Sequence, residues 1–150
     1  MIEATQTANP TEVNKITSPD GLELFRQELQ KRHDPNAPVI LVCSGTGCRA
    51  AGSAAVVDKF KEVLSGTGWN GKVLPLAKHT GCHGLCSRGP LVVIEPGNLF
   101  YQRVSVDDVD DIVNKTILNN EVIKKLQYKP ANSKEVIEKA GDIPFYAKQT

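Results

Sequence analysis

The chain has 150 residues, of which 40% are hydrophobic and 23% charged, and its net charge is +1. This composition is typical of one compact folded domain and excludes a mainly disordered chain. The balanced charge and the 5% aromatic content disfavour a nucleic-acid partner, and no apolar run is long enough to span a bilayer. The opening residues 1–10 are polar and lack the apolar core of a secretory signal, so a cytoplasmic location is expected.

The first third of the chain predicts a leader, a helix and a strand. Residues 1–19 are polar and aperiodic and are expected to form a flexible leader. Apolar residues recur at near-helical spacing over 21–31, which predicts a helix that Asp20 caps. The β-branched apolar run 38–42 predicts a strand buried on both faces, and this strand leads directly into Cys43.

The middle of the chain predicts the rest of an α/β core. In the hairpin, Pro96 and Gly97 form the turn, and Gly97 is expected to take the positive backbone angle. Ser105 and Asp108 form a capping box at the start of the last core helix. The order of the elements indicates a mixed four-stranded sheet flanked by helices. These elements are a helix over 53–66, a strand over 72–78, hairpin strands over 89–95 and 99–104, and a helix over 105–117.

The helical and strand patterns weaken after residue 119. A helix over 133–140 is one interpretation of the sequence there. The domain is therefore expected to span residues 20–128, followed by a linker or tail over 129–150.

Four cysteines form two close pairs, C-x4-C at Cys43 and Cys48 and C-x3-C at Cys82 and Cys86. Each pair follows a predicted strand, so neighbouring strands would bring the four sulfurs together at one end of the sheet. Glycines in both loops let the backbone approach closely and direct amide hydrogens at sulfur, as in iron-sulfur sites. Structural zinc more often uses a C-x2-C pair, so the wider spacing favours a binuclear cluster over zinc, disulfides or a thiol redox pair.

Three segments together resemble the thioredoxin-like [2Fe-2S] ferredoxin family: CSGTGCRAAGS from residue 43, TGCHGLCSRGPLVVI from residue 80 and FYQRVSVDDVDDIV from residue 100. The likeness covers about residues 20–128. Within the family, it is strongest to the domain in front of the NADH-binding flavoprotein subunit of complex-I-like enzymes and of bifurcating or NAD(P)-reducing [FeFe]-hydrogenases. The ending DIPFYAKQ resembles the entry to the flavin-binding part of such subunits.

The resemblance implies a thioredoxin-like fold with the cluster loops at one end of the sheet. It makes Cys43, Cys48, Cys82 and Cys86 the ligands of one [2Fe-2S] cluster, in agreement with their spacing. The function it implies is one-electron relay to or from a flavin or iron-sulfur partner that oxidises or reduces NAD(P)H. The module would have no catalytic site of its own and would form part of an NADH dehydrogenase or hydrogenase, with a homodimer as another assembly. A zinc-stabilised interaction module without redox activity is the alternative.

Five basic side chains lie near the cysteines in the sequence: Arg49, Lys78, His79, His83 and Arg88. They would either ease electron uptake by a negatively charged cluster or guide a partner, and His83 is not expected to ligate iron because four cysteines suffice. Ser87 departs from the acidic residue expected in many relatives, which bears on the reduction potential. The G-x-G-x-x-G match at 66–71 lies between a helix and a strand, the wrong order for a nucleotide site.

Overall fold

The computed structural model describes residues 15–32, 37–67, 75–131, 133 and 135–149. The chain divides into two compact units, Met1–Asp34 and Pro35–Thr150. In the first unit, the expected helix is confirmed as α1 (Pro19–Arg32). Its first turn is closed by Ser18 Oγ, which accepts a hydrogen bond from the Gly21 N–H at 3.1 Å, so the predicted cap at Asp20 is wrong. Most of the expected leader, residues 1–14, lies outside the described residues.

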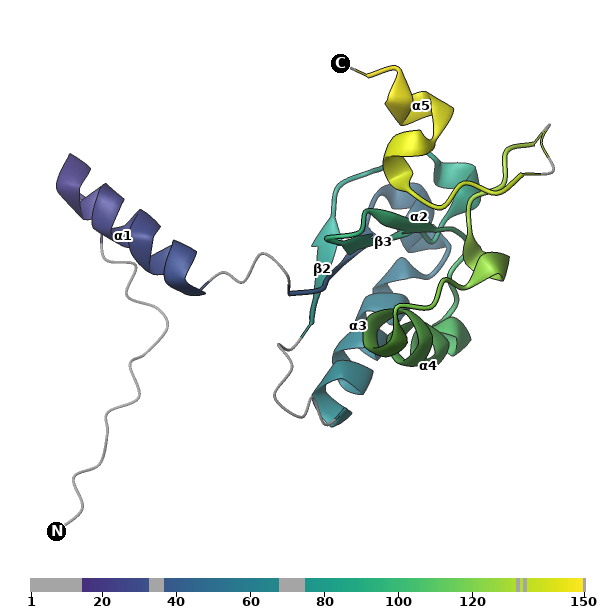
Figure 1. Ribbon diagram of the computed structural model, residues 1–150, viewed down its shortest axis with the longest axis horizontal. Helices are drawn as coiled ribbons and strands as arrows, with labels where there is room; N and C mark the ends of the chain where they lie inside the picture. Colours follow the sequence, from purple (N-terminus) through teal and green to yellow (C-terminus); the bar gives the residue numbers. More distant parts are fainter. Residues whose placement is uncertain (1–14, 33–36, 68–74, 132, 134, 150) are drawn as a thin grey trace, which may run out of the picture. The chain divides into compact units, whose positions relative to one another are not determined.

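The second unit is built on a mixed four-stranded sheet, as the sequence predicts (Figure 1). The structure adds the strand order, which is β2-β1-β3-β4. Strand β1 pairs parallel with β2 and antiparallel with β3, and β3 pairs antiparallel with β4. The first half of the second predicted strand, 72–74, lies outside the described residues. The strands are β1 (Val39–Cys43), β2 (Leu76–Thr80), β3 (Val92–Glu95) and β4 (Leu99–Tyr101).

The turn between β3 and β4 confirms the predicted hairpin but places its positive φ angle elsewhere. Asn98 has φ 51°, and Gly97 does not lie in the left-handed region. The Asn98 N–H donates to the Glu95 carboxylate at 3.3 Å. Asparagine tolerates this conformation better than most residues because its short polar side chain can hydrogen-bond locally.

Two helical segments cover one face of the sheet. Helix α3 (Ser53–Gly66) confirms the prediction and buries Phe60 completely. The last core helix begins with the predicted capping box, in which the Ser105 N–H donates to Asp108 at 3.0 Å. It continues as α4 (Val109–Asp111) and a π-helical stretch, η3 (Ile112–Leu118). Figure 1 shows α3 and α4 side by side, and both pack on strand residues of one core cluster.

The other face of the sheet is covered in part by residues 137–146, which the sequence pattern predicts to be a linker or tail. A helix over 133–140 is not formed by the described residues there. Instead, the chain makes antiparallel bridges from Tyr128 to Ile137 and from Leu99 to Lys139. A short turn, η5 (Ala140–Asp142), and helix α5 (Pro144–Ala147) follow. We call residues 137–149 the C-terminal segment; it is yellow in Figure 1.

None of the helices in the described ranges is both long enough and apolar enough to cross a membrane.

Candidate metal centre

The parallel pairing of β1 and β2 brings the two cysteine loops, residues 43–48 and 82–86, to the same end of the sheet. Cys43 is the last residue of β1 and lies opposite Thr80, the last residue of β2. The Ser44 N–H donates to the Thr80 carbonyl at 2.9 Å, which fixes the starting points of the two loops side by side. The expectation that both loops leave one end of the sheet is therefore confirmed.

The first loop contains a short helix that the sequence analysis interpreted only as a glycine-rich turn. Helix α2 (Thr46–Ala50) buries Cys48 and exposes Arg49. The second loop ends in a 3-10 turn, η1 (Cys86–Arg88). A five-residue helix has too few residues for an apolar periodicity to reveal it, and the loop contains two glycines, Gly45 and Gly47.

The four cysteines converge as two neighbouring pairs, one from each loop. Cys82 Sγ and Cys86 Sγ are 3.7 Å apart, and Cys43 lies close enough to Cys48 and to Cys82 to shift the pKa of both thiols. All four cysteines are free. Within the described ranges, no three His, Cys, Asp or Glu side chains are arranged to hold a single metal ion. Each loop therefore contributes one pair of sulfurs, and Cys43 is the member of the first pair that lies next to the second pair.

Three glycines allow the cysteine loops to approach this closely. A Cβ atom added at Gly45 would lie 3.1 Å from Cys82 Sγ, and one added at Gly89 would lie 2.7 Å from Cys48 Sγ. A Cβ added at Gly47 would lie 3.0 Å from the Cβ of Cys86. Each glycine thus faces a cysteine from another part of the chain. Four thiols approached closely by backbone in this way form a donor set that fits an iron-sulfur cluster.

The environment of the thiols favours protonation at some sulfurs and ionisation at others. Burial, together with the hydrogen bond to Cys43, raises the pKa of the Cys48 thiol to about 11. The neighbouring Cys82 raises the pKa of Cys86. By contrast, the Gly84 N–H donates to Cys82 Sγ at 3.4 Å and lowers the pKa of Cys82. Because metal ligands must be thiolates, binding of iron has to displace protons from this site.

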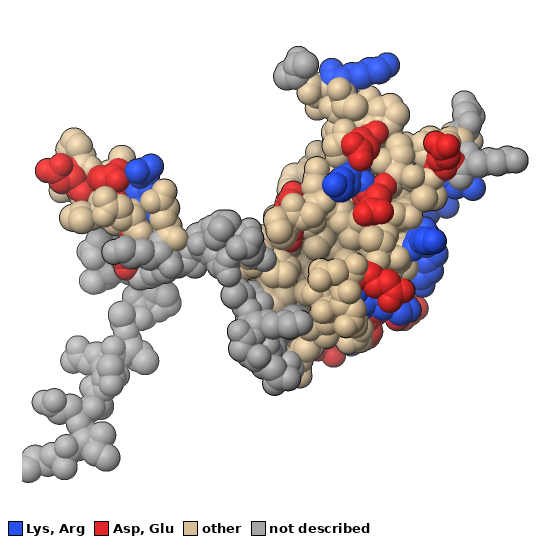
Figure 2. All heavy atoms as spheres, viewed as in Figure 1, with Lys and Arg blue, Asp and Glu red and all other residues tan. Residues whose placement is uncertain are grey.

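The basic residues near the cysteines have different surroundings. Lys78 and Arg49 are exposed, whereas the Arg88 guanidinium lies over the Tyr128 ring, 5.7 Å from its centroid. His79 Nδ1 lies 2.6 Å from the Ser44 hydroxyl. Burial lowers the pKa of His83, which makes this residue a poor cation and corrects its inclusion in the predicted basic group. Figure 2 shows acidic and basic side chains interspersed on the face in view.

The C-terminal segment adds residues to the site that the sequence analysis did not identify. Ile143 is 1% exposed and packs in one core cluster with Cys43 and Cys48. The Tyr146 hydroxyl donates to the His83 carbonyl, and burial raises the pKa of Tyr146, so the phenol stays a protonated donor. A Cβ at Gly84 would lie 3.1 Å from the Phe145 ring. Proline at the first position of α5 followed by two aromatic residues was the only local signal of this packing.

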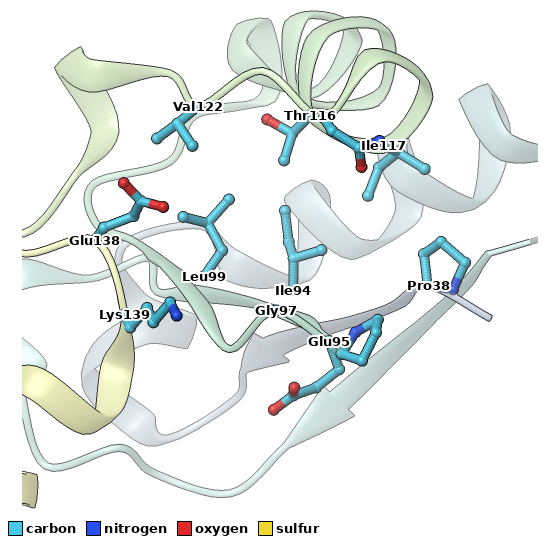
Figure 3. Close-up of a pocket in the computed structure, with 12 residues that line it drawn as sticks. Pro38, Ile94, Glu95, Gly97, Leu99, Thr116, Ile117, Val122, Glu138 and Lys139 are labelled. Atoms are coloured by element: carbon cyan, nitrogen blue, oxygen red, sulfur yellow. The ribbon is translucent and has the colours of Figure 1, made fainter. Parts of the chain in front are cut away.

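A pocket of about 470 Å³ lies at the opposite end of the sheet from the cysteines. It is lined in part by Pro38 and Glu95, which flank the start of β1. Figure 3 shows Leu99 pointing from the hairpin toward Val122 and Ile94 pointing toward Thr116. No cysteine lines this pocket, so it is separate from the candidate metal centre.

Comparisons with known proteins agree with the geometry. A family model, thioredoxin-like [2Fe-2S] ferredoxin, matches residues 25–117. The chain is 40% identical over 80 residues to a 2Fe-2S ferredoxin of Clostridium pasteurianum, covering 53% of this chain and 76% of that protein. It is 33% identical over 79 residues to one from Aquifex aeolicus, covering 53% of this chain and 70% of the relative.

Solved structures give the same result for the fold. A thioredoxin-like [2Fe-2S] ferredoxin from Aquifex aeolicus superposes with a TM-score of 0.55 at 27% identity. The match covers 65% of this chain and 98% of that structure. The thioredoxin-like fold expected from the sequence is confirmed, and Tyr146 lies beyond the residues that the family model matches.

Proposed function

The chain belongs to the thioredoxin-like [2Fe-2S] ferredoxin family, and we propose that Cys43, Cys48, Cys82 and Cys86 are the four ligands of its cluster. Members of this family carry a [2Fe-2S] cluster, so this is the cofactor of the chain, as expected in preference to zinc. When bound, the cluster supplies reversible one-electron transfer. The chain is thus an electron-transfer protein, and the assignment of its ligands is our proposal.

The observation that carries the ligand assignment is the convergence of four cysteines from two loops. Cys43 lies close enough to a cysteine of its own loop and to one of the other loop to shift the pKa of each. The glycines opposite Cys48, Cys82 and Cys86 leave no room for side chains between the loops and the sulfurs. Two thiolates for each iron is the arrangement that a four-cysteine [2Fe-2S] site requires.

The burial of the sulfurs indicates the side from which electrons enter and leave. Cys43 and Cys48 are buried, whereas Cys82 and Cys86 are exposed. A partner centre can come closest on the exposed side, next to η1 and Gly84. We therefore place electron exchange at the loop 82–86, with the buried pair anchoring the cluster in the protein.

The partner that we propose is a flavin or iron-sulfur subunit or domain that oxidises or reduces NAD(P)H, as in NADH dehydrogenases and hydrogenases. The support is the resemblance of the cysteine segments and of the ending DIPFYAKQ to the front module of such subunits. A partner domain of this kind would follow the C-terminal segment. The alternative assembly that we propose is a homodimer of this chain. The compartment that we propose is the cytoplasm, where thiols stay reduced.

The ligand assignment is tested by comparing Cys82→Ser with Ser87→Ala after purification without oxygen. We expect Cys82→Ser to lose or weaken the cluster, with altered visible absorption and less iron and acid-labile sulfide per chain. Ser87 is exposed next to a proposed ligand, so Ser87→Ala should keep wild-type iron and sulfide. Unchanged iron and an unchanged spectrum in Cys82→Ser would contradict the assignment.

The partner assignment is tested by following the visible absorption of the oxidised protein with NADH. NADH alone should leave the cluster oxidised. Addition of a catalytic amount of an NADH-oxidising flavoprotein subunit of the complex-I type should then reduce the cluster and bleach its visible absorption. Direct reduction by NADH, or equal bleaching by an unrelated flavoprotein, would contradict the proposed partner.

A further inference from the structure

The peptide unit between His83 and Gly84 is hydrogen-bonded at both ends. Its N–H, on Gly84, donates to Cys82 Sγ at 3.4 Å. Its carbonyl oxygen, on His83, accepts a hydrogen bond from the Tyr146 hydroxyl. One continuous chain of hydrogen bonds therefore runs from the phenol, through this peptide, to a cysteine sulfur.

The loop alone does not fix the orientation of this peptide. Gly84 has φ +79°, the value typical of the third position of a type II turn. Type I and type II turns differ chiefly by rotation of the peptide before that position, and glycine adopts either conformation at little steric cost. In the rotated state, the carbonyl oxygen would turn toward Cys82 and the N–H away from it, so the bond to sulfur would be lost.

The C-terminal segment holds the phenol against this peptide. Ile143 anchors the segment because it is 1% exposed among residues that include two of the cysteines. The Tyr146 N–H donates to the Ile143 carbonyl at 2.8 Å, which fixes the first turn of α5 on that anchor. The Phe145 ring packs edge-on to Tyr146 at 5.2 Å between centroids and lies next to Gly84, so both aromatic side chains lie against the loop.

We propose that Tyr146 is a positioning residue for electron transfer, whose hydroxyl holds the His83–Gly84 peptide so that its N–H is directed at the Cys82 sulfur. The inference rests on the proposed role of Cys82 as a ligand. Hydrogen-bond chains polarise their members, so the phenol also strengthens the N–H···S bond that it orients. Outer contacts of this kind orient and tune metal ligands, although they do not touch the metal.

The sign of the effect follows from charge. Reduction adds one electron to a site that already carries thiolate charge, and an N–H directed at sulfur stabilises the more negative state more strongly. The hydrogen bond through Tyr146 therefore favours the reduced protein. Removing the hydroxyl should make reduction harder and shift the midpoint potential to a more negative value.

The test is an anaerobic redox titration of the intact protein with Tyr146→Phe and, as the matched control, Tyr128→Phe. Tyr128 packs on Phe100 near the cysteines, but none of its described contacts is with the loop 82–86. We expect Tyr146→Phe to lower the ratio of reduced to oxidised protein about threefold at a fixed potential, a shift of about 30 mV for one electron. Tyr128→Phe should titrate like the wild type. Equal potentials for Tyr146→Phe and the wild type, or an equal shift in the control, would overturn the proposal.

Hydrogen exchange of the loop 82–86 provides a second measurement, which does not depend on a bound cluster. In the iron-free protein, the Gly84 amide should exchange faster in Tyr146→Phe than in the wild type or Tyr128→Phe. Unchanged exchange together with an unchanged potential would show that the phenol does not hold the peptide. Faster exchange in Tyr146→Phe, combined with full cluster retention in Cys82→Ser, would overturn the ligand assignment and leave the peptide contact in place.

Discussion

One face of the sheet is covered by α3 and α4, and the other by the C-terminal segment. The helical face, defined by Ile40, Val42, Phe60 and the residues packed with them, consists of regular apolar contacts between helices and strands. The cysteine face, defined by Cys43, Cys48, Leu91, Val93, Phe100 and Ile143, is smaller and is closed by irregular chain. Successive side chains of β1 point to opposite faces of the sheet, so Cys43 belongs to the cysteine face and its neighbour Val42 to the helical face.

The two faces of the sheet have different tasks: the helical face stabilises the fold, and the cysteine face holds the cofactor. The helical face can bury large side chains without disturbing the thiols. The cysteine face must keep glycines against sulfur, and the C-terminal segment packs on it and hydrogen-bonds to the loop next to Cys82. Changes on the helical face should therefore alter the free energy of unfolding, and changes on the cysteine face should also alter cluster retention.

The largest expected loss of stability is for Phe60→Ala on the helical face. Phe60 is fully buried between α3 and the sheet, so its truncation leaves a large cavity. The free energy of unfolding should fall by about 3–5 kcal/mol, measured by urea unfolding followed by circular dichroism. The folded fraction should release iron to a chelator at the wild-type rate. Faster iron release from folded Phe60→Ala would show that the two faces are not separable.

Ile143→Ala provides the corresponding change on the cysteine face. Its side chain is also buried, and its loss should cost about 3 kcal/mol. Because Ile143 anchors α5 beside the cysteines, we expect iron release to a chelator several-fold faster than in Phe60→Ala at equal fractions of folded protein. Equal rates for Ile143→Ala and Phe60→Ala would contradict the comparison.

Gly89→Ala tests the close approach of backbone to sulfur. The added Cβ would lie 2.7 Å from Cys48 Sγ, so the loop has to move, at a cost of about 1–3 kcal/mol. Gly97→Ala is the matched control, since no atom lies within 4 Å of a Cβ there. Visible absorption and iron content should change in Gly89→Ala and stay constant in Gly97→Ala. A wild-type spectrum for both variants would show that the glycine contact is not needed for cluster binding.

The smallest effect is expected for Asp108, which begins the last core helix. Burial opposes its ionisation, but Lys125 at 2.7 Å and Ser105 outweigh burial and hold the Asp108 pKa below its ordinary value of 3.8. A carboxylate with a lowered pKa stabilises the folded state above pH 3.8, and this contribution is lost as pH falls through the lowered pKa. Asp108→Asn should cost about 1 kcal/mol at neutral pH and less in acid. If Asp108→Asn lowered the free energy of unfolding by the same amount at every pH, the ion pair with Lys125 would not be the source of the stability.

The sequence predicts the helical face better than the cysteine face, for physical reasons. Val56, Val57 and Phe60 follow helical spacing, and the valine-rich strands are continuous apolar runs, so both are visible in short windows. The cysteine pairs are equally local, and their spacing with nearby glycines was enough to predict convergence. Asn98 took the positive angle predicted for Gly97, because the register of the hairpin, and not residue preference alone, selects the turn position.

The enclosure of the cysteine face was not predictable in the same way. Tyr146 and His83 are 63 residues apart in the sequence, and no periodicity links the two. The apolar residues of the C-terminal segment, Ile143 among them, follow neither helical nor strand spacing, so the sequence does not distinguish a packed segment from a linker. Contacts of this kind follow from the tertiary arrangement, once β1, β2 and β3 have placed the cysteine loops.

Native mass spectrometry of the anaerobically purified protein tests most directly whether one chain holds one cluster with its own four cysteines. The account predicts that each chain carries the added mass of two irons and two sulfides, and that replacing any one of Cys43, Cys48, Cys82 or Cys86 by serine reduces this occupancy. A chain that binds a single zinc or iron without sulfide, or a cluster found only between two chains, would contradict it.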